Sequence, residues 1–105
     1  MSSEQNITAF IYDKRGRLLS AAKNSYIKTH PLQAKLAKEV SLPDKQFLHA
    51  EVAALVRLKD WKKAHSIFIT RIGKNGEPLL AKPCPVCARA IQLAGIKNIS
   101  FTTSS

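Results

Sequence analysis

Two short strand-like segments stand at the start of the chain. Residues 7–12 are rich in β-prone residues, and the largely apolar segment 18–22 follows after a charged, glycine-containing turn at residues 13–17. Two such segments joined by a tight polar turn are typical of a β-hairpin. The sequence therefore predicts that the chain opens with a pair of antiparallel strands.

Two helices are predicted in the middle of the chain. Pro31 suits the first position of a helix, and apolar residues recur after it at helical spacing through Val40. Residues 41–47 contain a proline and an aspartate and predict a loop. A second helix is expected from Leu48 to about Asp60, and its centre is apolar on every side. A helix of this kind is buried on more than one face.

The second half of the chain predicts a strand, a helix and a strand. In order, the segments are an apolar strand at residues 65–72, a turn at 75–76, a short extended piece at 79–81, a helix at about 86–94 that Gly95 ends, and a strand at 96–103. The whole order is β-β-α-α-β-α-β. This order predicts an α/β fold in which a mixed sheet carries helices on its faces.

Length and composition limit the class of protein. The 105 residues, of which 45% are apolar, suffice for one packed core but not for two. No apolar run approaches the roughly 20 residues of a membrane span, and the polar N-terminus lacks the pattern of a signal peptide. We expect a single domain over residues 1–105 that lies in the cytoplasm and does not bind membranes. A domain of this size with a helix buried all round is a marginal monomer, so we also expect a homo-oligomer.

The chain is strongly basic. Its net charge of +10 comes from 17 Lys and Arg against 7 Asp and Glu. A positive charge of this size attracts polyanions. It is compatible with binding to nucleic acid, with binding to a phosphorylated substrate, and with an effect on solubility alone. The basic residues include two groups far apart in the sequence, Lys14, Arg15 and Arg17 in the predicted hairpin turn and Arg57, Lys59, Lys62 and Lys63 near the end of the second predicted helix.

Three residues, His49, Cys84 and Cys87, are of the types that bind zinc. The cysteines lie three residues apart where the third helix begins, so both side chains can face one point and the helix N-terminus favours their thiolates. His49 lies at the start of the second predicted helix. Three protein ligands leave one position of tetrahedral zinc open, which is typical of catalytic sites.

Glu51 lies two residues after His49 in an otherwise apolar stretch. Burying a carboxylate without a role is costly, and a carboxylate beside a zinc-activated water can move its proton. The same residues are also compatible with a closed structural zinc site, with a redox pair of Cys84 and Cys87, or with Glu51 as a partner of the helix dipole. No fourth ligand is evident in the sequence for a closed site, and a redox pair leaves His49 and Glu51 without a role.

The pattern His49-Ala50-Glu51, followed after 31 residues by Pro83-Cys84-Pro85-Val86-Cys87, resembles the cytidine and deoxycytidylate deaminase superfamily. This combination is far more specific than Cys-x-x-Cys alone, and the predicted order of elements extends the resemblance over nearly the whole chain. The resemblance implies a three-layer α/β/α fold and a Zn²⁺ ion held by His49, Cys84 and Cys87. It further implies that Glu51 carries protons while activated water attacks C4 of cytosine and ammonia leaves.

Four further residues are candidates for substrate binding. Asn24 resembles the asparagine with which many relatives hold the sugar or base, but asparagine is equally common in turns. Ala50 is a candidate to donate its backbone amide to the base. Phe47 either stacks on the base or packs in the core. Lys82 either holds a phosphate or is a solvated surface charge.

Three functions are compatible with these features. The first is deamination of a cytosine nucleoside or nucleotide, such as cytidine, deoxycytidine or dCMP. The second is deamination of cytosine or adenine in single-stranded DNA or RNA, and the third is a non-catalytic zinc protein that binds nucleic acid. Glu51 argues against the third, and the lack of aromatic residues leading to the motif argues against the second. A small-molecule substrate is therefore favoured, although purine deaminases share the same motifs.

Overall fold

The elements of the fold follow one another in the order that the sequence predicts. The computed structural model describes residues 6–24, 31–39, 49–58, 60–73 and 75–103. The elements are β1 (Asn6–Tyr12), β2 (Leu18–Lys23), α1 (Pro31–Glu39), α2 (Ala50–Arg57), the 3₁₀ helix η1 (Trp61–Lys63), β3 (Ser66–Ile72), α3 (Pro85–Leu93) and β4 (Asn98–Phe101). Only the short helix η1 is additional to the predicted order.

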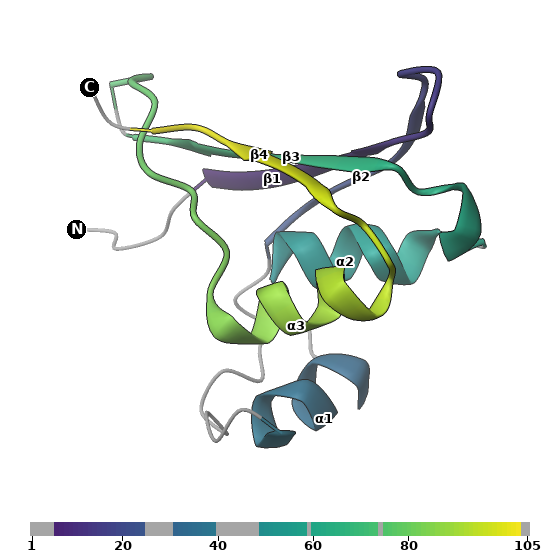
Figure 1. The fold of residues 1–105 in the computed structure, drawn as a ribbon. Coiled ribbons are helices and arrows are strands. Elements are labelled where there is room, and N and C mark those ends of the chain that lie inside the picture. The colour runs from purple at the N-terminus through teal and green to yellow at the C-terminus, as the bar shows by residue number, and fades with distance from the viewer. Residues whose placement is uncertain (1–5, 25–30, 40–48, 59, 74, 104–105) are drawn as a thin grey trace.

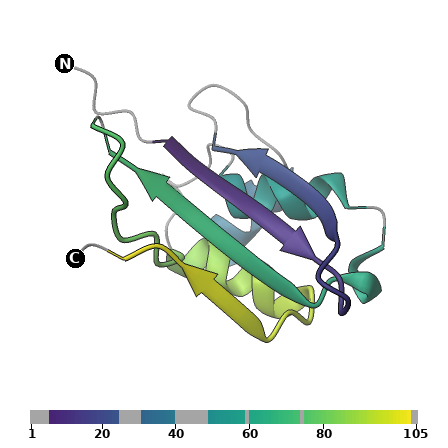
Figure 2. The same ribbon diagram turned by 90° about the horizontal axis from the view of Figure 1, so that it is seen from above.

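The four strands form one mixed sheet in the order β2-β1-β3-β4 (Figure 2). β1 runs antiparallel to both β2 and β3, whereas β3 and β4 are parallel and are connected through α3. Because side chains alternate along a strand, Ala9 and Ile11 of β1 and Ile67 and Ile69 of β3 all enter the core, where they are fully or almost fully buried. The predicted α/β class and mixed sheet are confirmed.

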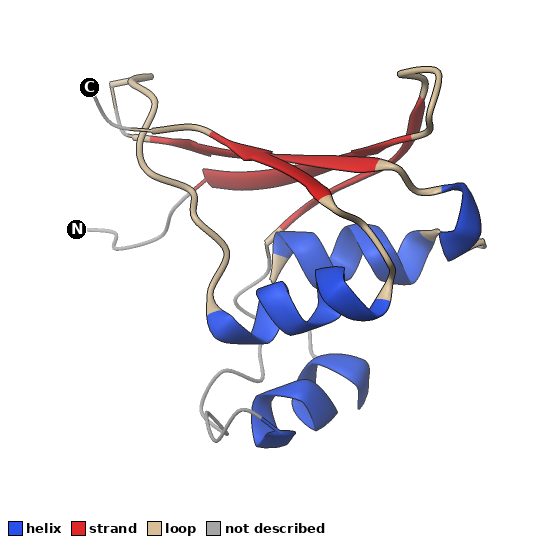
Figure 3. Ribbon diagram, in the orientation of Figure 1, coloured by secondary structure: helices blue, strands red, loops and turns tan. Residues whose placement is uncertain are grey.

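The described helices all lie on the same side of the sheet (Figures 1 and 3). α2 packs on β1, β2 and α3, and α1 contacts α3. The layers therefore run from the sheet to α2 and α3 and then to α1, instead of covering both faces of the sheet as expected. On the opposite face Phe10 and Phe68 stack with ring centroids 6.5 Å apart and stay partly exposed. None of the described helices is long and apolar enough to cross a bilayer.

Helix α2 ends earlier than its apolar pattern predicts. It stops at Arg57 because the Leu58 N–H turns back to the Leu55 carbonyl, at 3.1 Å. The Trp61 indole N–H also donates to the Leu55 carbonyl, at 2.8 Å. The Asp60 side chain then accepts a hydrogen bond from the Lys62 N–H, at 3.0 Å, and begins η1. An aspartate that bonds its neighbouring backbone in this way competes with helix continuation.

The segment before α3 is extended but does not join the sheet as a strand. Ala81 donates its N–H to the Thr102 carbonyl at 2.9 Å, which holds the predicted extended piece at residues 79–81 beside the end of β4. After α3, Gly95 adopts a φ of +79° and a pair of hydrogen bonds, Gly95 N–H to Gln92 and Ile96 N–H to Ile91, closes the helix. Gly95 ends α3 as predicted, directly after the C-cap residue Ala94. Strand β4 is shorter than the predicted residues 96–103.

Candidate metal centre

His49 occupies the N-cap position of α2. Its backbone is extended, with φ −79° and ψ 157°, and its carbonyl accepts a hydrogen bond from the Ala53 N–H at 2.9 Å. The helix behind it is fastened to β2 at two points. The buried Ser20 hydroxyl donates to the Ala54 carbonyl at 2.8 Å, and the Arg57 guanidinium donates to the Ala21 carbonyl at 3.0 Å. These two bonds hold the whole helix α2, and with it His49, in position relative to the sheet.

Cys84 occupies the same N-cap position in α3. A residue that precedes proline is disfavoured in the helical region, and Cys84 before Pro85 is accordingly extended, with φ −72° and ψ 168°. Pro85 begins the helix at no cost because the first helical N–H has no partner inside the helix. Cys87 follows one turn later and is fully buried. Pro85 thus helps to place both sulfurs at one end of α3.

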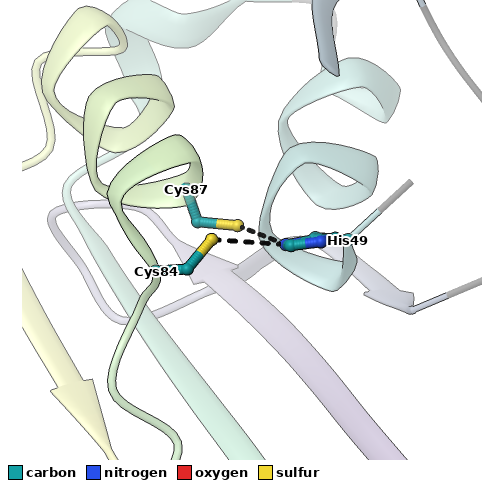
Figure 4. Close-up of side chains that lie close together, drawn as sticks. All are labelled: His49, Cys84 and Cys87. Atoms are coloured by element: carbon teal, nitrogen blue, oxygen red, sulfur yellow. Dashed lines mark hydrogen bonds between the residues drawn. The ribbon is translucent and has the colours of Figure 1, made fainter. Parts of the chain in front are cut away.

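The side chains from the two helix starts converge (Figure 4). The imidazole Nδ1 of His49 lies 3.2 Å from Sγ of Cys87 and 3.5 Å from Sγ of Cys84. The three donor atoms all lie within 4.8 Å of one another, and both cysteines are free thiols rather than a disulfide. Among the described residues, this is the group of histidine, cysteine and acidic side chains that is arranged to hold a metal ion.

The two thiols differ in pKa. The Cys87 thiol beside Cys84, followed by His49, lowers the pKa of Cys84 to about 3. The same contact with Cys84, together with burial, raises the pKa of Cys87 well above its ordinary value. Of the two thiols, Cys84 therefore ionises far more readily than Cys87. A thiolate at a helix N-terminus is the form of cysteine that binds metal ions.

Glu51 lies in the first turn of α2 and is only 6% exposed. Burial raises the pKa of its carboxyl group, while the charge of His49 opposes this rise and the charge of Cys84 adds to it. The Cys87 side chain also interacts with the carboxylate. Glu51 is thus a buried carboxylate in the first turn of α2, beside the sulfur and imidazole donors.

The donor set fits zinc. Tetrahedral zinc, with bonds of about 2.3 Å to sulfur and about 2.0–2.1 Å to nitrogen, separates neighbouring sulfur and nitrogen donors by roughly 3.5 Å. The separations of 3.2 Å and 3.5 Å in this structure agree with that value. Two sulfurs and one imidazole are also the ligand types that zinc prefers. Within the described residues no fourth protein ligand completes the group, which leaves a position for water or substrate.

The remaining candidates from the sequence occupy different positions. Ala50 begins α2 and is fully buried, and Lys82 is exposed two residues before Cys84. The Asn24 side chain accepts a hydrogen bond from the Ile7 N–H at 3.3 Å and so closes the end of the β1–β2 pair. Phe47 lies outside the described residues. The substrate-binding roles of all four residues stay predictions.

The residues that hold α2 in place are not evident from the sequence. Ser20 is a polar residue that is buried between apolar neighbours in β2, and this interruption of the apolar pattern is the signal it carries. Arg57 carries no such signal, because its bond to the Ala21 carbonyl depends on how α2 lies across β2.

Comparison with protein families gives an independent result. The family model described as "Cytidine and deoxycytidylate deaminase zinc-binding region" matches residues 1–103 of the chain. The match includes both helix starts and the four strands. No curated protein matches the chain significantly.

Proposed function

Because the chain belongs to the cytidine and deoxycytidylate deaminase zinc-binding family and is a zinc-dependent deaminase, we propose that its substrate is a cytosine nucleoside or nucleotide and its product the uracil equivalent. The observation that carries this proposal is the buried carboxylate of Glu51 beside the donors of His49, Cys84 and Cys87. In this proposal those three residues hold Zn²⁺ and Glu51 is the catalytic residue.

The chemistry divides between the ion and the chain. Zinc, when bound, acts as a Lewis acid that lowers the pKa of water. Glu51 accepts a proton from the attacking water on a carboxylate oxygen and delivers it to N3 of the ring as the water oxygen bonds to C4. Glu51 then passes the second proton from that oxygen to the exocyclic nitrogen. The C4–N bond breaks, ammonia leaves and a carbonyl remains, so one water is consumed for each ammonia released.

Burial of the carboxylate supports this proton transfer. A general acid–base works best when its pKa lies near the working pH, and burial raises the pKa of Glu51 in that direction. The Glu51 side chain is itself only 6% exposed, so bulk water has little access to its carboxyl group. Glu51 can therefore hold a proton between the two transfers without losing it to bulk water.

A small substrate agrees with the distribution of charge. The basic residues near the end of α2 lie at its C-terminal end, whereas His49 lies at its N-terminus. An eight-residue helix spans about 12 Å, so the length of α2 separates these charges from His49. The exposed Lys82 is the described basic side chain nearest in sequence to Cys84 and suits a single phosphate. We place this reaction in the cytoplasm, with a free nucleoside or nucleotide as partner.

The proposal is tested by ammonia release from the zinc-loaded protein. Cytidine, deoxycytidine, dCMP and a cytosine-containing oligonucleotide are compared at equal base concentration, with the matching adenine compounds in parallel. We expect turnover of at least one free cytosine compound and loss of that turnover in Glu51→Gln. Turnover of the oligonucleotide alone would contradict the proposed substrate class.

A further inference from the structure

Two basic groups that are far apart in the sequence meet in one groove. The groove lies between the β1–β2 turn and η1 and has a volume of about 680 Å³. Its basic lining residues are Lys14, Arg15, Arg17, Lys62 and Lys63. The remaining lining residues are Asp13, Leu18 and Leu19. Five positive side chains and one negative one thus surround a single open space.

The single acidic residue of the groove is already engaged. Asp13 accepts hydrogen bonds from the backbone N–H groups of Arg15 and Arg17, each at 2.9 Å, and pairs with the Arg17 guanidinium at 3.1 Å. These contacts lower the pKa of Asp13, with the Arg17 backbone N–H contributing most. Asp13 therefore shapes the turn and neutralises Arg17.

The other four basic side chains of the groove are available to contact a ligand. Lys14, Arg15, Lys62 and Lys63 are exposed, and none of them forms a salt bridge with an acidic side chain in the described part of the chain. Like charges held around one space repel one another, so an anion that bridges them gains from all four. The groove is therefore suited to a ligand with several negative charges in a row.

The apolar part of the lining indicates what kind of polyanion fits. Leu18 is 56% exposed although it begins a strand, and it lies in the groove among the basic side chains. Single-stranded nucleic acid offers both a row of phosphates and unstacked bases with apolar faces. Duplexes keep their bases stacked inside, and polyphosphate has no apolar part.

From this combination we infer that the groove binds the backbone of a single-stranded nucleic acid, at a site separate from the metal centre. Lys14, Arg15, Lys62 and Lys63 contact the phosphates, and Leu18 contacts a base. The groove lies between the β1–β2 turn and η1, and η1 follows the C-terminal end of α2. The metal donors lie instead at the N-terminal starts of α2 and α3. This inference does not depend on the proposed deaminase substrate, because it concerns binding at another end of the molecule.

Binding is measured by the fluorescence anisotropy of a labelled 12-nucleotide single strand over a series of salt concentrations, with the zinc-loaded protein. Neutralising one phosphate of a single strand releases about 0.7 counterions. The double variants Lys14→Gln/Arg15→Gln and Lys62→Gln/Lys63→Gln should each weaken binding severalfold and reduce the slope of log K against log salt by roughly 1.4.

The matched control is Lys35→Gln/Lys38→Gln, which removes the same charge from exposed positions of α1. It should change the slope far less than either groove variant. Equal slopes in the groove and control variants would show that binding follows net charge alone and would overturn the inference. Circular dichroism of each variant checks that the fold is retained.

Leu18→Ser separates a nucleic acid from other polyanions. This variant should weaken binding of the single strand and leave binding of inorganic polyphosphate of equal charge unchanged. Polyphosphate or a matching DNA duplex that binds as tightly as the single strand would contradict the assignment. Turnover of a free nucleotide by the groove variants should equal that of the unchanged chain, so a failed deaminase proposal and a failed binding proposal give different results.

Discussion

Nδ1 of His49 lies 3.5 Å from Sγ of Cys84, and each of these residues is the N-cap of its helix. An N-cap is the last residue with non-helical backbone, so its side chain is free to project beyond the helix end. Neither residue uses its side chain to cap its own helix. The two side chains are instead directed at a common point, where the helix N-termini favour negative charge.

The first prediction concerns zinc. Cys84→Ala and Cys87→Ala should each lose most of their bound zinc, because two remaining ligands cannot hold the ion tightly. Elemental analysis after dialysis against a weak chelator measures the loss, and a melting curve should show a lower Tm in both variants. His65→Ala, which removes an exposed histidine outside the group, should retain about one zinc per chain. Full occupancy in either cysteine variant would rule out this ligand set.

The second prediction concerns Glu51. Glu51→Gln preserves the size of the side chain but cannot carry a proton, so turnover should fall by about 10² to 10⁴ while zinc content stays unchanged. Glu77→Gln provides the control, since Glu77 is exposed and lies outside the metal group. A Glu51→Gln protein with ordinary activity would disprove the proposed mechanism but not the zinc site.

The third prediction separates two roles of Asn24. Asn24→Ala removes the acceptor for the Ile7 N–H and should lower the free energy of unfolding by about 1 kcal/mol. Asn24→Asp keeps that acceptor but loses the amide donor. If Asn24 holds the substrate, the aspartate variant should unfold like the unchanged chain and show a raised KM. An unaltered KM in the aspartate variant would leave Asn24 with the structural role alone.

The fourth prediction concerns the support of the metal centre by the core. Leu55 is fully buried in α2, and Leu55→Ala should reduce the free energy of unfolding by about 2–5 kcal/mol. Leu93→Ala, at a position that is 49% exposed in α3, should change it by about 0.5 kcal/mol or less. Urea titration of both variants provides the comparison. Equal costs would mean that Leu55 does not pack as described.

The fifth prediction concerns assembly. The sheet face that carries Phe10 and Phe68 is partly exposed, and no described helix covers it. Together with the short length of the chain, this favours a homo-oligomer. Sedimentation velocity at micromolar concentration should give a mass that is a multiple of 11.6 kDa. A single species of 11.6 kDa under those conditions would refute the prediction.

Features with a local cause could be predicted from the sequence. Pro85 and Gly95 mark the two ends of α3 because each imposes its own backbone geometry. The early end of α2 differs from the predicted one because Asp60 and Trp61 act against an apolar pattern that suggests a longer helix.

Features that depend on how elements pack could not be predicted. The covering of a single face of the sheet by the described helices depends on the orientation of whole helices, which local pattern does not encode. The basic groove arises because the β1–β2 turn and η1 meet, although Arg17 and Lys62 are 45 positions apart in the chain. The motif of the metal centre is an exception among such long-range contacts, because its residue types and spacing are specific enough to identify the partners.

The helix starts that carry His49 and Cys84 have a mechanical consequence. The two residues are 35 positions apart, so an ion held between them closes a loop that contains all of α2, η1 and β3. A cross-link that closes a loop of this length lowers the conformational entropy of the unfolded chain and so favours the folded state. A bound metal ion therefore also cross-links α2 and α3. Its removal should weaken the packing of α2 against α3 before it disturbs the hairpin of β1 and β2.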